Sequence, residues 1–218
     1  IQNSSNDTQM FCVGDDWQSI FRFAGSDINV MKDFGDYFSV FERSDLTVTF
    51  RSEEKITKHA THFILQNDNQ IPKDVSSVRT EEGPSMVVCF EGKNKESLLV
   101  DIITEITENT GVTEVPNILI LGRYNLKNYN EDYKAIFAKI RRKFPQISLD
   151  YKTVHRSKGL EADYVIILEV ISGFLGFPNE MADDHVLNMV LAKREKFPNA
   201  EERRLFYVAL TRAKKKVF

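Results

Sequence analysis

The sequence predicts an α/β domain in which a parallel sheet carries helices on both faces. Short apolar runs alternate with amphipathic helical patterns from about residue 46 to the end of the chain, and this alternation is typical of parallel sheets. Two runs, Ile118–Leu121 and Val165–Leu168, are continuously apolar, as expected for strands buried on both faces. A chain of 218 residues that is 42% hydrophobic is long enough for one sizeable core and at most a small appendage.

The elements can be placed along the chain from these patterns. Before the alternation we expect a polar tail over 1–9, a short strand over 10–13, a helical turn over 18–23 and an amphipathic helix over 28–38. Strands are then expected at 46–50, 86–90, 117–121, 147–154 and 164–168, with a last one beginning at 216. Helices are expected after Ser52 as N-cap and over 95–108, 129–143 and 201–215. The segments 71–84 and 172–197 are predicted to be irregular.

The stretch Glu201–Lys215 is predicted as a helix that Asn199 caps, with Glu202 completing a capping box. Its apolar stripe includes Leu205 and, seven residues on, reaches Arg212. Because burying an unpaired guanidinium is costly, Arg212 needs an anion. That anion is either a carboxylate that only holds the fold or a phosphate, which the planar fork of arginine suits well.

Composition limits the class of protein. The net charge of −3 gives no global basic field, so binding of nucleic acid would need a local groove. Cys12 and Cys89 have no CxxC spacing, predict neither a disulfide framework nor a metal site, and fit a reducing cytoplasm. No apolar run approaches the roughly 20 residues of a membrane span, and the sequence contains no signal-peptide pattern. The cysteines thus favour a cytoplasmic protein. The chain begins at Ile1 with no initiator Met and ends where a strand begins, so we expect it to be a piece of a longer protein.

Polar groups follow several predicted strands. They are Asp15, Asp16 and Gln18 after the first, Arg51 after the second, Arg123 and Asn125 after 117–121, and His155–Glu161 after 147–154. Ligands of open α/β sheets bind beyond the carboxyl ends of the strands, so we expect these groups and Arg212 to form a polyanion site at one rim. The alternative is that charged residues crowd the loops of any α/β domain. The phosphate loop GxxxxGK[ST] is absent, so a nucleotide would find only part of its site here.

Four stretches resemble motifs of the UvrD/Rep-type superfamily 1 DNA helicases, closest to the helicase IV branch. Gly14–Gly25 resembles the third motif, Leu46–Ser52 the fourth, Thr153–Glu161 the fifth and Glu201–Ala213 the sixth. The four matches come in the order of the family and extend from residue 14 to residue 213. Four long matches in register are far more specific than one short pattern.

The resemblance implies a RecA-like second motor domain (2A) of a motor that clamps ATP between two domains while single-stranded DNA crosses them. Residues 1–27 would be the end of the first domain and a linker, and residues 28–218 the second domain, without an inserted 2B domain. ATP with Mg²⁺, single-stranded DNA and the N-terminal motor domain are the implied ligands and partner. The implied activity is that of an ATP-dependent 3′–5′ DNA helicase. The Walker motifs and the Mg²⁺ ligands would lie outside this chain, which alone would be inactive.

The motif matches assign a nucleotide group that consists of Gln18, Arg51, Arg212, Phe50, Glu161 and Gly159. By resemblance, Gln18 senses the γ-phosphate, and the two arginines stabilise its developing charge. Phe50 would stack on adenine, and Glu161 would lie near the sugar and phosphates. The residues alone leave other interpretations open: an exposed loop amide for Gln18, a strand-end core residue for Phe50 and a solvated loop acid for Glu161.

The matches also assign a DNA group. Phe23 corresponds to an aromatic residue on which a base stacks, although composition alone favours a core position for it. His155, Arg123 and Asn125 correspond to positions that line the DNA path, and structural hydrogen bonding is the alternative for all three. Lys158 has no assigned role, since phosphate or a local carboxylate could take its charge.

The sequence departs from the family pattern at two positions. Ala24 stands where a second arginine is frequent, and Trp17 stands where a small acidic residue is commoner. Two other hypotheses remain beside the motor half: a non-catalytic module that binds DNA or protein, and the motor part of a helicase–nuclease fusion. The joint presence of Gln18, Arg51 and Arg212 favours the motor, because a binding module needs no γ-phosphate sensors.

Overall fold

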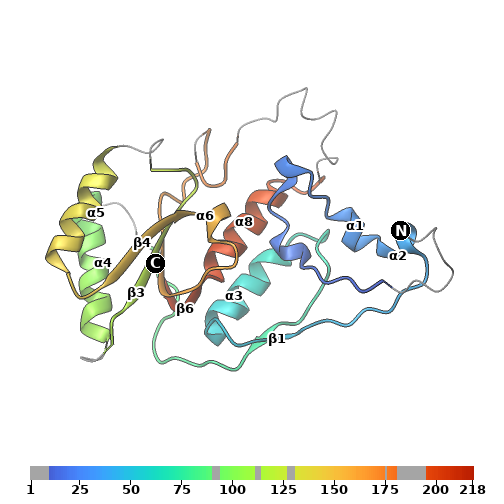
Figure 1. Ribbon diagram of the computed structural model, residues 1–218, viewed down its shortest axis with the longest axis horizontal. Helices are drawn as coiled ribbons and strands as arrows, with labels where there is room; N and C mark the ends of the chain where they lie inside the picture. Colours follow the sequence, from blue (N-terminus) through green and yellow to red (C-terminus); the bar gives the residue numbers. More distant parts are fainter. Residues whose placement is uncertain (1–9, 90–93, 111–113, 127–130, 175, 181–194) are drawn as a thin grey trace.

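A computed structural model describes residues 10–89, 94–110, 114–126, 131–174, 176–180 and 195–218. Its main sheet is parallel, with strand order β4-β3-β5-β6. The strands are β3 Asn117–Gly122, β4 Ser148–Thr153, β5 Ala162–Ile167 and β6 Ala213–Val217. Helices lie on both sides of this sheet (Figure 1), so the predicted fold class is confirmed.

Two hydrophobic clusters sandwich the sheet. The helices α4 (Lys95–Asn109) and α5 (Glu131–Lys143) pack on the face that carries Ile118 and Ile120. The helices α3 (Glu54–Ile64) and α8 (Ala200–Leu210) pack on the face that carries Leu119 and Leu121. Successive residues of a strand point to opposite faces, so one apolar strand serves both clusters. None of the described helices has the length and apolarity to cross a bilayer.

The segment with the third motif packs against the core. It forms two 3-10 turns, η1 (Asp16–Gln18) and η2 (Arg22–Ala24). Trp17 and Ile20 are fully buried in the same cluster as α3 and α8. The single helix expected over 28–38 is split into α1 (Asn29–Lys32) and α2 (Phe34–Phe38). The expected domain boundary after residue 27 stays a prediction, as does the absence of a 2B domain.

The expected strands at 10–13, 46–50 and 86–90 differ from the structure. Residues 10–13 form no strand, and β1 (Val48–Thr49) pairs only with β2 (Ser76–Ser77), outside the main sheet. The strand expected at 86–90 is described only as far as residue 89, and within it only Met86 forms a β-bridge, with Val217 of β6. The chain around Met86 thus occupies the sheet edge beside β6. The segment around β1 does not pair with that edge.

Two helix termini also differ from expectation. The N-cap of α3 is Glu53, whose carboxylate accepts from the amides of Lys55 and Ile56, and Ser52 is one residue too early. Helix α8 ends at Leu210, because the following residues pair with β5 as strand β6. Asn199 holds the N-cap position of α8 in a left-handed conformation, but its side chain makes no capping bond.

Candidate nucleotide and DNA site

The predicted site residues form two groups at opposite ends of the sheet. Arg123 and His155 follow the carboxyl ends of β3 and β4, whereas Glu161 and Arg212 immediately precede β5 and β6. The amide of Ala162 donates to the carbonyl of Arg212 at 3.0 Å, which ties these two amino ends together. Residues 154–161 run back along the sheet, because β4 and β5 are both parallel to β3. The expectation that all these residues share one carboxyl rim is therefore wrong.

Arg212 is buried in the turn between α8 and β6, with 1% of its surface exposed. Its Nε donates to the carbonyl of Val208 at 2.9 Å and one terminal nitrogen donates to the carbonyl of Leu160 at 3.2 Å. The other terminal nitrogen donates to Oγ1 of Thr211 at 3.2 Å. These bonds fix the guanidinium between the end of α8 and the chain that enters β5.

The charge of Arg212 has no carboxylate partner within ion-pair distance among the described residues. One alternative from the sequence was a carboxylate that pairs with Arg212 and only holds the fold. No such carboxylate is found among the described residues. Burial, and then the nearby charge of Arg51, lowers the pKa of Arg212 to about 10. The guanidinium stays charged at neutral pH and retains an unmet demand for an anion.

Arg51 and Glu161 complete a charged cluster around Arg212. Arg51 Nε lies 3.2 Å from Glu161 Oε2, and Lys214 Nζ lies 2.6 Å from Glu161 Oε1. Lys214, and then Arg51, holds the pKa of Glu161 below its usual value. The Arg51 pair is half-exposed, and pairs of this kind contribute only about 0–1 kcal/mol. Arg51 can therefore exchange its partner for a ligand at little cost.

Phe50 and Gly159 flank this cluster in sequence. Phe50 is 72% exposed, so the interpretation of Phe50 as a core residue is wrong and its ring is open to stack on a ligand. Gly159 has φ +86°, a left-handed conformation that favours glycine. Its role is thus to turn the chain between Lys158 and Glu161, and a nucleotide contact by Gly159 stays a prediction.

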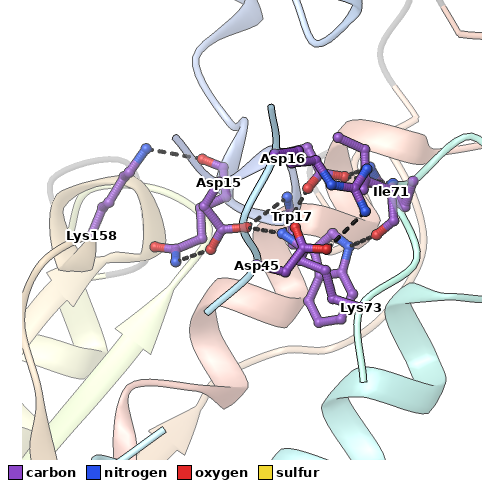
Figure 2. A network of polar contacts seen from close by, with 10 residues as sticks. Asp15, Asp16, Trp17, Asp45, Ile71, Lys73 and Lys158 are labelled. Carbon is purple, nitrogen blue, oxygen red and sulfur yellow. Dashed lines mark hydrogen bonds and ion pairs between the residues drawn. The ribbon is translucent and has the colours of Figure 1, made fainter. Parts of the chain in front are cut away.

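Gln18 belongs to a polar network that joins η1 to residues 70–73 (Figure 2). Its side-chain amide donates to Oδ2 of Asp15, and the other carboxylate oxygen of Asp15 lies 2.9 Å from Lys73 Nζ. Lys73 Nζ also lies 2.8 Å from Oδ1 of the buried Asp16. Asp15 is among the charges that act on Arg212, so Gln18 and Arg212 belong to one neighbourhood.

The DNA group is built around three aromatic rings. The ring centroids of Phe21, Phe23 and His155 lie 5.7–5.9 Å apart in pairs. Phe23 is 62% exposed, so its assignment to the core is wrong. Burial, and then the charge of Arg123, lowers the pKa of His155 to about 4. At neutral pH this imidazole is an uncharged ring that supports Phe23.

A cleft of about 720 Å³ extends from these rings toward the start of α8, and Phe23, Arg123, His155, Glu201 and Glu202 contribute to its lining. Arg123 and Glu202 form a bidentate pair with nitrogen–oxygen distances of 2.7–3.1 Å. The guanidinium of Arg123 is thus already paired inside the cleft. Asn125 is exposed and does not contribute to the lining.

Several residues of the site escaped the sequence analysis. Lys73 lies in the segment expected to be an irregular connection, and no local pattern marks it. Arg204 is fully buried and pairs with Glu195 at 2.6 Å. In the sequence it is one of four consecutive charged residues, 201–204, and no pattern predicts that it alone is fully buried. Lys158, which the sequence analysis named without a role, donates to the carbonyl of Gln18 at 3.0 Å.

Comparison with known proteins identifies the family. The family profile described as the UvrD-like helicase C-terminal domain matches residues 138–218. DNA helicase IV of Escherichia coli (strain K12) is 35% identical over all 218 residues. The chain belongs to the UvrD/Rep-type superfamily 1 helicases. This UvrD/Rep-type chain spans 30% of the length of DNA helicase IV.

Two further relatives are more distant. The putative ATP-dependent DNA helicase YjcD of Bacillus subtilis (strain 168) is 27% identical over 123 residues, which is 56% of this chain and 16% of YjcD. A probable DNA helicase of Mycoplasma pneumoniae is 24% identical over 216 residues, which is 96% of this chain and 37% of that protein. The UvrD/Rep-type chain thus corresponds to a part of each relative. Its described residues contain no cluster of three or more His, Cys, Asp or Glu that could hold a metal ion.

Proposed function

We propose that the full-length protein is an ATP-driven translocase and helicase that moves 3′ to 5′ on single-stranded DNA. In this proposal the chain is the second motor domain, with residues 1–27 as the end of the first domain and a linker. The observation that carries the proposal is Arg212, a fully buried guanidinium with no carboxylate partner in the described part of the chain and with Arg51 nearby. Two neighbouring cations with an unmet demand for an anion suit a triphosphate.

The nucleotide group would act on the γ-phosphate. Arg212 is held by backbone carbonyls, so it needs no rearrangement to meet charge that develops during phosphoryl transfer. Arg51 would leave Glu161 for the phosphate, and Phe50 would stack on adenine. Glu161 and Gly159 would line the sugar and phosphate side. We expect the Walker loop and the Mg²⁺ ligands on the first motor domain, which closes the other side of ATP.

The DNA group would provide part of the single-strand track. Phe23 offers an exposed ring beside His155, and stacking of a base on such a ring is worth about 1–3 kcal/mol. His155 would contribute as an uncharged ring. Arg123 would have to leave Glu202 to reach a phosphate, so we infer a smaller contribution to affinity from Arg123 than from Phe23. Asn125 would meet the strand outside the cleft.

The test is DNA-stimulated ATP turnover by the full-length protein and by its Arg51→Ala variant. We expect turnover in the wild type, a loss of about 10³-fold or more in the variant, and single-strand affinity within about twofold. Arg51 is a half-exposed residue, so folding should tolerate this change. If the wild type binds single strands but hydrolyses no ATP, the chain is a helicase-like binding module instead.

A further inference from the structure

Lys73 lies outside all four helicase motifs, yet it contacts the segment that carries Gln18 (Figure 2). Its ammonium lies between the carboxylates of Asp15 and Asp16, at 2.9 and 2.8 Å. It also lies 4.6 Å from the centroid of the Trp17 ring. Only 12% of its side chain is exposed. Burial lowers the pKa of Lys73, but the two carboxylates outweigh that effect and raise the pKa above its usual value.

The network anchors η1 rigidly on the second domain. Asp16 Oδ2 accepts from the amide of Ile71 at 2.8 Å and from the side chain of Gln70 at 3.1 Å. Trp17 Nε1 donates to the carbonyl of Ile71 at 3.0 Å. The two residues that follow Asp15 are therefore held by Gln70 and Ile71.

Asp15 determines which end of the Gln18 amide faces outward. An ionised carboxylate only accepts hydrogen bonds, and one oxygen of Asp15 already receives the ammonium of Lys73. Its other oxygen can then pair only with the nitrogen of the Gln18 amide, as found. The carbonyl oxygen Oε1 of Gln18 has no hydrogen-bond partner among the described residues. The Gln18 side chain thus keeps its carbonyl oxygen available as an acceptor, while its nitrogen is bound to Asp15.

We propose that Lys73, acting through Asp15, is a positioning residue that holds Gln18 as an acceptor for the water that attacks ATP. This inference rests on the proposed function. The water oxygen would bond to the γ-phosphorus while the bond from that phosphorus to the β–γ bridging oxygen breaks, which gives ADP, phosphate and one proton. An acceptor aligned on the water orients its lone pair toward phosphorus, as a glutamine does in other nucleotide hydrolases.

The experiment is a double-mutant cycle in the full-length protein with Lys73→Met and Gln18→Ala, followed by single-strand-stimulated ATP turnover. Lys73→Met alone should lower kcat about 10- to 100-fold, the effect of a small misplacement, while KM for ATP changes less than threefold or so. In the Gln18→Ala background, Lys73→Met should lower kcat by no more than about twofold, because residues that act as a unit are not additive.

Lys216→Met is the matched control. Lys216 pairs with Glu105 and has 16% of its side chain exposed, close to the exposure of Lys73, but it lies on β6 against α4. Its kcat should stay within about twofold of the wild type. A binding readout avoids turnover altogether: the wild type should prefer ADP with aluminium fluoride over ADP, and Lys73→Met and Gln18→Ala should lose that preference to a similar extent.

Equal fold-losses from Lys73→Met in the wild-type and Gln18→Ala backgrounds would overturn the inference while leaving the proposed function intact. Absence of ATP turnover in the wild type would instead overturn the proposed function. If Lys73→Met does not fold, Asp15→Asn provides the test, since Asp15 is more exposed than Lys73. The asparagine side chain can donate as well as accept, so it no longer requires the nitrogen of the Gln18 side chain as its partner. A kcat of Asp15→Asn equal to that of the wild type would then refute the inference.

Discussion

Arg212 and Arg204 offer a comparison within one motif that separates catalysis from stability. Both guanidinium groups are buried, with exposed fractions of 1% and 2%. Arg204 pairs with Glu195 at 2.6 Å and also donates to the carbonyl of Ser19 at 2.7 Å. Arg212 has only neutral acceptors in the described part of the chain. We therefore expect opposite consequences when each is replaced by alanine.

The magnitudes follow from these contacts. Arg204→Ala leaves the buried carboxylate of Glu195 without its cation, and breaking a buried pair in this way costs about 3–5 kcal/mol. Arg212→Ala loses three hydrogen bonds worth about 1 kcal/mol each, but it also removes a desolvated charge, so we expect a net loss of about 1–3 kcal/mol. Loss of an arginine that stabilises phosphoryl transfer reduces the rate about 10³- to 10⁵-fold, or about 4–7 kcal/mol.

Two assays decide between the roles. Denaturant unfolding of the 218-residue chain should show a larger loss of stability for Arg204→Ala than for Arg212→Ala. ATP turnover of the full-length protein should show the reverse order, with Arg212→Ala nearly inactive and Arg204→Ala reduced only in step with its folded fraction. The reasoning is refuted if Arg212→Ala loses as much stability as Arg204→Ala and its turnover declines only with the folded fraction.

Three further outcomes are expected. Phe23→Ala should weaken single-strand binding about 5- to 150-fold while basal ATP turnover and stability stay near the wild type, as filter binding would show, with Tyr37→Ala on α2 as an exposed aromatic control. Phe50→Ala should raise KM for ATP about tenfold by loss of stacking with no change in thermal stability, and an unchanged KM would exclude Phe50 from the adenine site. The folded-state pKa of His155, about 4, lies below its ordinary 6.5, so unfolding takes up a proton in that range. The free energy of unfolding should therefore decline more in the wild type than in His155→Phe, by about 1–2 kcal/mol between pH 7 and pH 4.5 once the shift is discounted for the partial exposure of the ring. Equal declines would contradict the lowered pKa of His155.

The core of the fold was predictable because buried positions recur in the sequence with the period of a helix or form continuous apolar strands. The apolar runs of β3 and β5 and the inward residues of α4 all lie where their periodicity places them. The strand at 46–50 was mispredicted because alternation alone does not say which edge a strand joins. The end of α8 was mispredicted because Thr211–Lys215 can form helix as well as strand, and pairing with β5 decides.

The sequence could nominate candidate site residues by type, but it could not predict how they are arranged in space. Phosphate and DNA residues were expected at one rim, whereas the chain from β4 returns along the sheet and separates Glu161 from His155. The partners of Arg212 could not be predicted because two of the three are backbone carbonyls, which carry no sequence signal. Lys73 is 58 residues from Asp15, and only the folded chain brings them together.

The claim that this chain holds one half of an ATP site is tested most directly by DNA-stimulated phosphate release from two proteins, the full-length protein and the isolated 218-residue chain. The full-length protein should turn over at about 1–10³ s⁻¹. The isolated chain, shown to be folded by a cooperative thermal transition, should release no phosphate above background, because in this proposal Arg51 and Arg212 only stabilise the γ-phosphate and the loop that cradles it lies on the first motor domain. Turnover of the isolated chain in the same range as the full-length protein would contradict the account.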